Sequence, residues 1–370
     1  MWRSRLQDIA TRAAIPLGIF LASRLAVLAA AYAAVLVGPE DSLIDVLGRW
    51  DGAWYLRLAE RGYPHAVPVG VGNPAQSTLA FLPGYPLLVR GLMDRGVYSI
   101  TAGVVVSTIA STVAAVALWF LVQRLSDRSL ATRSVALWSF FPGAQALSMV
   151  YADGLFLLLA ILCLHALLRE RWVVAGVTAA LAGAVRPNGM FLVACCLWAA
   201  VVALRAGRGL RALTAPLLAP LGALAFFTYL FERTGDPLAW PHAQARGWAQ
   251  GVDFGWSAVT NVVHVARGPL DDFNLLASGL TFVALIAAMV LLTRWRPPVV
   301  LVIYTLAIAI PVIISRGHHL TPRTFVIAFP LLIATARAVR GSAFAGLLAA
   351  SASLMAVLAL LAGATVSFTP

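Results

Sequence analysis

Long runs of apolar residues, separated by short polar segments, follow one another from Ile15 to Ala364. A helix needs roughly 20 apolar residues to cross the hydrocarbon core of a bilayer, and segments of that size fit about 11 times, a few of them short or broken. The pattern predicts an all-α, polytopic membrane protein with a single membrane domain over residues 1–370. We place the spans near residues 13–37, 99–122, 134–150, 154–168, 172–185, 189–204, 212–231, 275–293, 299–314, 324–340 and 343–364.

Two polar segments, residues 38–98 and 232–274, are too long to be simple turns between spans. Loops of this length usually carry function. In the first, apolar and aromatic residues recur at helical spacing over residues 49–63, which predicts a short amphipathic helix at the membrane interface. A second short helix is expected over residues 87–93. The second segment contains Trp240, Trp248 and Trp256, which are either interface anchors or platforms on which sugars stack.

Composition and charge give the expected orientation in the membrane. Hydrophobic residues make up 61% of the chain and charged residues 11%, and the mean hydropathy is +0.87. The chain has no lysine, so all 27 basic residues are arginine. The tails and loops on the amino-terminal side of the membrane contain fifteen arginines and three acids, and this difference accounts for the whole net charge of +12. The positive-inside rule therefore places the amino terminus in the cytoplasm and both long loops outside it. The positive charge is explained by topology, so we expect no nucleic-acid partner.

Polar residues also gather at the ends of the predicted spans on the side of the long loops. Asp51 lies between Trp50 and Trp54 at the edge of the membrane, where a carboxylate is costly and usually functional. Taken singly, each such residue is more often a loop residue or a headgroup anchor. Their presence together favours a site, because the positive-inside bias disfavours arginines on this side. The other members are Asp153, Arg186, Asn188, His318 and Arg323.

Several of these residues lie in segments that resemble the motifs of PIG-V-type mannosyltransferases, the family of the second mannosyltransferase of GPI-anchor synthesis and its bacterial relatives. Residues 49–63 read RWDGAWYLRLAERGY and resemble the first-loop motif of that family. Residues 81–86 (FLPGYP) are similar to its Phe-Phe-Pro-x-x-Pro, and residues 186–189 (RPNG) to its Arg-x-Asn-Gly. Residues 151–156 (YADGLF) resemble Tyr-x-Glu-Ser-Leu-Phe, with Asp in place of Glu. Pro322-Arg323, followed by Phe329-Pro330, resembles the Pro-Arg and later Pro of the family's last motif.

The resemblance implies a GT-C glycosyltransferase, a polytopic enzyme that transfers a hexose, here mannose, from a polyprenyl-phosphate carrier to an acceptor hydroxyl at the extracytoplasmic face, with inversion. Within that reaction we expect Asp51 to be the general base. Arg186 and Arg323 are expected to hold the phosphate through their planar forks, with His318 as a weaker candidate. Asp153 could orient the acceptor or pair with an arginine. Further substrate contacts are expected from Arg49, Trp50, Trp54, Tyr85 and Asn188.

The predicted chemistry requires no cofactor or metal, because phosphate is already a good leaving group and no Asp-x-Asp motif occurs. The expected partners are the bilayer, the lipid-linked donor and an acceptor that is a glycan, a glycolipid or a protein. A transporter or lipid-linked sugar flippase is the alternative, since it also contains broken helices and intramembrane charges. Such a protein should contain inverted repeats and charges near the bilayer midplane, whereas this chain has no evident repeat. A non-catalytic subunit of the same fold would not need Asp51.

Overall fold

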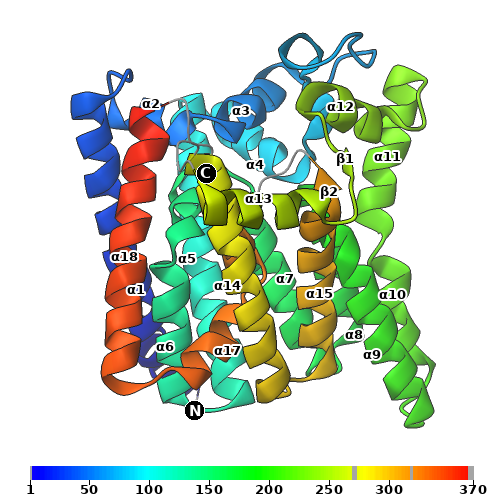
Figure 1. Ribbon diagram of the computed structural model, residues 1–370. Helices are drawn as coiled ribbons and strands as arrows, with labels where there is room; N and C mark the ends of the chain where they lie inside the picture. The colour runs from blue at the N-terminus through cyan, green and yellow to red at the C-terminus, as the bar shows by residue number, and fades with distance from the viewer. Residues whose placement is uncertain (1, 269–272, 317–319, 366–370) are drawn as a thin grey trace.

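The computed structural model describes residues 2–268, 273–316 and 320–365. Long helices run side by side through the molecule, and a layer of shorter helices covers one end of them (Figure 1). Within the described residues, six helical stretches are long and apolar enough to cross a membrane. The chain is therefore an all-α, multi-pass membrane protein, as predicted. The six stretches lie in α1 (Trp2–Val37), α5 (Ser99–Leu125), η4 with α9 (Pro187–Phe191 and Leu192–Arg205), η5 with α10 and α11 (Leu210–Leu213, Thr214–Leu218 and Leu221–Thr234), α14 (Phe273–Trp295) and α18 (Gly341–Ala364).

Two further apolar helices, α8 (Trp172–Val185) and α15 (Val299–Ile314), are shorter. A seventh span forms if η3 (Pro142–Ser148) and α7 (Asp153–Leu167) are taken together, although they are bent by 104° where they meet. The prediction of one continuous span over residues 134–150 is wrong: α6 (Arg128–Ser139) ends within this range at Ser139, and η3 follows as a separate turn. The cause is Pro142, which forces Phe141 into an extended conformation and stops the helix.

A buried arginine of α1 holds this break together. Arg24 is 5% exposed, and its guanidinium donates hydrogen bonds to Ser139 O at 2.8 Å, Ala144 O at 2.6 Å and Ser148 Oγ at 2.9 Å. Carbonyl groups freed by a helix break at membrane depth need partners inside the protein. Arg24 supplies such partners on both sides of the break and so fixes the position of η3.

The predicted span over residues 324–340 is also interrupted, giving α16 (Arg323–Ile327) and α17 (Pro330–Ala338). Pro330 cannot continue the first of these helices because it lacks a backbone N–H. The freed carbonyl groups are again satisfied from buried side chains: Tyr304 Oη donates to Ile327 O at 2.8 Å, and Trp138 Nε1 donates to Val326 O at 3.1 Å. The short α16 is therefore anchored at its end, next to η3.

The layer over one end of the long helices is built from both long loops. The first loop forms α2 (Leu43–Gly48), α3 (Asp51–Arg61), η1 (Asn73–Ala75), η2 (Thr78–Ala80) and α4 (Gly84–Met93). The second forms α12 (Ala239–Trp248), β1 (Gly251–Val252) and α13 (Trp256–Arg267), and β1 pairs antiparallel with β2 (Ser315–Arg316). Trp240 Nε1 and Gln244 Nε2 both donate to Ala80 O, at 3.2 and 3.1 Å, which joins the two loops.

The two ends of the molecule differ in composition. The amino terminus and the short connection between α5 and α6, which Arg124 and Arg128 flank, lie at the end opposite to the layer of short helices (Figure 1). At that opposite end Arg208 pairs with Glu170, which joins the connection after α9 to the one after α7. Both long loops, and with them Asp51, thus share one end of the helix bundle.

Candidate active site

Asp51 is the first residue of α3, and the turn before it is held by the last helix of the chain. Trp50 has φ 59° and ψ −125°, a backbone conformation that side-chain-bearing residues rarely adopt and that costs roughly 1–3 kcal/mol. The conformation persists because Trp50 and Arg49 are both tied to the end of α18, where carbonyl groups have no partner within the helix. The indole Nε1 and the guanidinium donate to the carbonyl groups of Ala362, Gly363 and Thr365.

Asp153, the first residue of α7, binds two arginines from distant parts of the chain. Arg323, at the start of α16, donates from Nε to Oδ1 at 2.7 Å and from Nη2 to Oδ2 at 2.6 Å. Arg186, between α8 and η4, donates from Nη1 to the same Oδ2 at 2.5 Å. The Asp153 side chain is only 1% exposed, and a carboxylate so deeply buried is tolerated because its charge is paired and hydrogen-bonded. Of the two roles expected for Asp153, the structure shows the pairing with arginine.

Arg323 links this buried pair to Asp51. Its Nη1 lies 3.5 Å from Asp51 Oδ2, and its Cζ lies 4.5 Å from the centroid of the Tyr151 ring. A Cβ at Gly143 would come within 2.3 Å of Arg323 Cα, so η3 can approach α16 this closely only with glycine at that position. The Asp51 side chain is 34% exposed, against 12% for Arg323. Asp51 is therefore the accessible end of the cluster.

The arrangement of the four charged groups determines what the cluster can bind. Asp153 accepts from Nε and Nη2 of Arg323, and Nη1 of the same guanidinium donates to Asp51. Nε of Arg186 is buried and has no hydrogen-bond partner within the described residues. Arginine forks held in fixed positions suit phosphate and carboxylate groups. The cluster can therefore bind an oxyanion next to a carboxylate that is able to accept a proton.

Aromatic side chains from both long loops lie along α3 beside the cluster. The ring of Trp54 is nearly parallel to that of Phe81, with centroids 6.2 Å apart, and meets Trp248 of α12 edge-on at 5.5 Å. The Arg57 guanidinium lies over Trp54, 4.6 Å from its centroid. Trp54 is thus part of an aromatic cluster that spans the two loops, and its half-buried ring remains available to a ligand.

The remaining predicted site residues are Tyr85, Asn188 and His318. Tyr85 is fully buried in the core, where its hydroxyl donates to Gly103 O at 2.9 Å and where burial raises the pKa of the phenol far above its ordinary value. Its position is that of a packing residue between α4 and α5. Asn188 follows Arg186 closely in the chain, within η4, and is half-buried. His318 lies outside the described residues.

Three residues that position the cluster were not among those predicted. Tyr151 lies in the YADGLF segment, so the sequence did contain a signal for it. Arg24 is an arginine inside the first apolar run, and an intramembrane charge is by default a candidate for function. The role of Gly143 depends on the approach of α16, which no local pattern indicates. Within the described residues, no group of three or more His, Cys, Asp or Glu side chains is placed to hold a metal ion.

Comparison with solved structures places the fold among the membrane-embedded glycosyltransferases of the GT-C type. ArnT from Cupriavidus metallidurans, bound to undecaprenyl phosphate, is 15% identical with a TM-score of 0.54, and the match covers 89% of this chain and 61% of ArnT. The Archaeoglobus fulgidus oligosaccharyltransferase, in complex with zinc and sulfate, is 15% identical with a TM-score of 0.50, over 93% of this chain and 54% of that enzyme. The chain thus spans less than two thirds of either enzyme, and at this identity the likeness concerns the fold alone.

The family follows from the sequence match. The family model for mannosyltransferase (PIG-V) matches residues 2–208, more than half of the chain, and the protein belongs to this family. The resemblance read from the motifs is thereby confirmed. The matched region contains Asp51, Asp153 and Arg186, whereas Arg323 lies beyond it. A search of curated proteins found no match to the chain.

Proposed function

We propose that this protein is an inverting mannosyltransferase that moves mannose from a polyprenyl-phosphate carrier to an acceptor hydroxyl at the extracytoplasmic face of the membrane. The observation that carries the proposal is an accessible carboxylate, Asp51, beside a fixed arginine cluster in a chain of the PIG-V family. Undecaprenyl phosphate bound to ArnT, a protein of similar fold, supports a lipid-linked donor. Such a donor can reach a membrane-embedded site from within the bilayer.

The reaction is a single displacement at the anomeric carbon. The acceptor oxygen forms a bond to that carbon while its proton passes to Asp51, and the bond from the same carbon to the phosphate oxygen breaks. The carrier phosphate leaves with the bonding electrons, and Arg186 and Arg323 hold its developing charge. Asp153 takes no part in the bond changes and keeps both arginines oriented. One displacement inverts the anomeric configuration, and neither the base nor the leaving group calls for a metal, so we expect transfer to persist in chelator.

The central experiment measures transfer by purified protein in detergent, with radiolabelled polyprenyl-phosphate-mannose and candidate lipid or glycan acceptors. Asp51→Asn keeps the size of the side chain but cannot take the proton, so the rate should fall about 10²–10⁴-fold while donor binding survives. Asp41→Asn, an exposed carboxylate of the same loop, is the control and should keep the wild-type rate. Normal turnover by Asp51→Asn would remove Asp51 as the base.

Two further measurements separate the proposal from its alternatives. Proton NMR of the product should give an anomeric configuration opposite to that of the donor, and retention would contradict a single displacement. A transporter or flippase would instead move sugar or lipid across sealed vesicles without transferring it. That movement, together with an absence of transfer from any polyprenyl-phosphate sugar, would replace the enzyme proposal.

The proposed orientation is tested by cysteine labelling. Val71 of the first loop and Ser126 after α5 are both exposed, and the native residues Cys163, Cys195 and Cys196 are buried. In intact cells a membrane-impermeant thiol reagent should label Val71→Cys, while Ser126→Cys should react only after permeabilisation. Labelling of both from the same side would overturn the extracytoplasmic site.

A further inference from the structure

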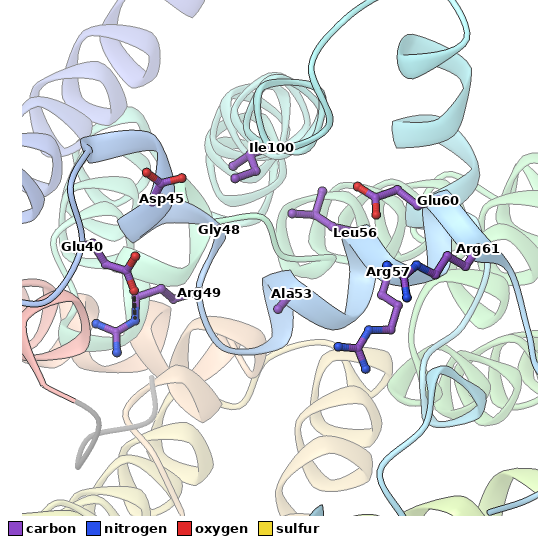
Figure 2. Close-up of a pocket in the computed structure, with 10 residues that line it drawn as sticks. All are labelled: Glu40, Asp45, Gly48, Arg49, Ala53, Leu56, Arg57, Glu60, Arg61 and Ile100. Carbon is purple, nitrogen blue, oxygen red and sulfur yellow. Dashed lines mark ion pairs between the residues drawn. The ribbon is translucent and has the colours of Figure 1, made fainter.

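The first loop also forms an open cavity of about 410 Å³, between α2, α3 and the start of α5 (Figure 2). Its volume falls within the roughly 300–1,000 Å³ of ligand sites in proteins. Figure 2 shows charged side chains at both ends of the cavity and the apolar side chains of Ala53, Leu56 and Ile100 between them. The charged residues are Glu40, Asp45 and Arg49 at one end and Arg57, Glu60 and Arg61 at the other.

The cavity lies on the face of α3 opposite to Asp51. Ala53, Leu56, Arg57 and Glu60 follow the i, i+3, i+4, i+7 spacing that places residues on one face of a helix. Asp51 is two residues before Ala53, which turns it to the other side of the helix axis. Arg57 lines the cavity and also lies over the Trp54 ring, so this side chain contacts both the cavity and the aromatic cluster beside Asp51. An α-helix with its side chains is roughly 10–12 Å across, so a ligand that reached both places would be longer than one sugar.

The lining indicates the chemistry of the ligand. Three carboxylates and three guanidinium groups cancel in charge, so the cavity offers no net attraction to an ion. The Glu40–Arg49 pair, with 3.3 Å between Oε1 and Nε, is already internally neutral. Carboxylates accept hydrogen bonds and guanidinium groups donate them, and hydroxyl groups do both. A polar rim at each end with an apolar strip between matches a sugar chain, which carries hydroxyl groups at its edges and C–H groups on its faces.

We propose that this cavity binds the sugar units of the acceptor that lie beyond the reacting one, and that the acceptor is therefore a neutral, polyhydroxylated chain of more than one sugar. The inference rests on the proposed transferase function, because it gives the cavity a role in presenting the acceptor hydroxyl to Asp51. Arg57 and Arg61, four residues apart on α3, donate hydrogen bonds to sugar hydroxyl groups at one end of the cavity. Asp45 accepts hydrogen bonds from sugar hydroxyl groups at the other end. The sugar chain then crosses the first turn of α3.

The kinetic test uses octyl glycosides with one, two and three hexose units as acceptors. In the wild type the KM for the acceptor should fall about tenfold or more from one hexose unit to three. In Glu60→Ala and in Arg61→Ala this gain in apparent affinity should be severalfold smaller. Both residues are exposed, so neither substitution removes buried packing. Arg95→Ala, an exposed arginine after α4 that does not line the cavity, is the matched control and should keep the full gain. A KM that is independent of chain length in the wild type would overturn the proposal.

A binding test that needs no turnover separates this inference from the transferase function. Saturation-transfer NMR on the protein in nanodiscs, with α-mannotriose and maltotriose as probes, should show contact with at least two adjacent sugars, and Arg61→Ala should reduce it. The signal should not change with salt, because the ligand is neutral. If neither probe contacts the protein, or if Arg61→Ala leaves the contact unchanged, the sugar site is refuted. Stronger binding of phosphoethanolamine than of the two sugars would refute it as well. Sugar binding without transfer by the wild type would instead refute the transferase function and leave the sugar site standing.

Discussion

Replacing Asp153 by Asn tests whether one buried carboxylate holds the arginine cluster together. The substitution keeps the shape of the side chain but removes its charge, and it puts an amide NH₂ where one carboxylate oxygen accepted hydrogen bonds from arginine. Arg323 and Arg186 make three such bonds in all, at 2.5–2.7 Å. An amide with its oxygen at the Oδ2 position keeps two of them, and one with its oxygen at the Oδ1 position keeps one.

The size of the effect follows from the burial of the three groups. Asp153 is 1% exposed, and Arg186 and Arg323 are 16% and 12% exposed, so solvent screens the lost attraction only weakly. Removing one partner of a buried ion pair typically costs about 3–5 kcal/mol. The arginines also lose their fixed positions, and a displacement of about 1 Å at a reacting centre can lower the rate about 100-fold. We therefore expect Asp153→Asn to lower both the thermal inactivation temperature and kcat.

Two variants make this test specific. Asp94→Asn removes a charge that is paired with Arg90 at 2.9 Å but is 62% exposed, and such surface pairs contribute only about 0–1 kcal/mol. It should change neither quantity. Asp153→Glu keeps the charge with one more methylene group, so it should lose less activity than Asp153→Asn. Initial rates at saturating acceptor and inactivation curves in nanodiscs measure both effects. Wild-type kcat and stability in Asp153→Asn would refute the role assigned to this carboxylate.

Three further predictions address neighbouring residues. Arg186→Lys and Arg323→Lys keep the charge but lose the planar fork. If each Lys variant loses one hydrogen bond to the charged phosphate, worth about 1.5–3 kcal/mol, its affinity for sugar-free polyprenyl phosphate should fall about 10–100-fold. Unchanged dissociation constants in both variants would make the two arginines headgroup anchors. Trp50→Phe keeps an aromatic ring but loses the hydrogen bond to Ala362 O, so kcat should fall severalfold while the affinity for the donor stays the same. An unchanged kcat would show that this hydrogen bond does not position Asp51. Arg24→Met leaves buried carbonyl groups without hydrogen-bond donors, which costs about 1–3 kcal/mol for each group. The Met variant should therefore inactivate at a lower temperature than Arg24→Lys, and equal inactivation temperatures would contradict the role of Arg24 in fixing η3.

The sequence predicts the membrane helices well where one apolar run forms one helix, as over residues 99–122 and 343–364. It fails where proline interrupts an apolar run, as at Pro142 and Pro330. An apolar run shows that a segment can lie in the bilayer, but the path of the chain there depends on whether freed carbonyl groups find donors. Those donors, such as Arg24 and Tyr304, come from elsewhere in the chain.

The site was predictable to a similar degree and for a similar reason. Asp51, Asp153, Arg186 and Arg323 could be named because arginines are disfavoured on the side of the long loops and because all four lie in segments that resemble family motifs. Their pairing could not be read from the chain, because Asp153 meets one arginine 33 residues away and another 170 residues away. Tyr85 lies in a motif next to the site, but in the structure its side chain turns into the core.

The cluster assigns different tasks to groups that differ in burial. Asp153, at the start of α7, is enclosed and paired, so it is suited to fixing the two arginines and poorly placed to react. Asp51 is partly exposed and lies at the end of a strained turn, where the last helix holds it and solvent or a ligand can still reach it. Because Arg323 and α18 complete the site from beyond residue 208, residues 2–208 cannot form it alone. The full charge arrangement therefore depends on contacts between the first loop and the last third of the chain.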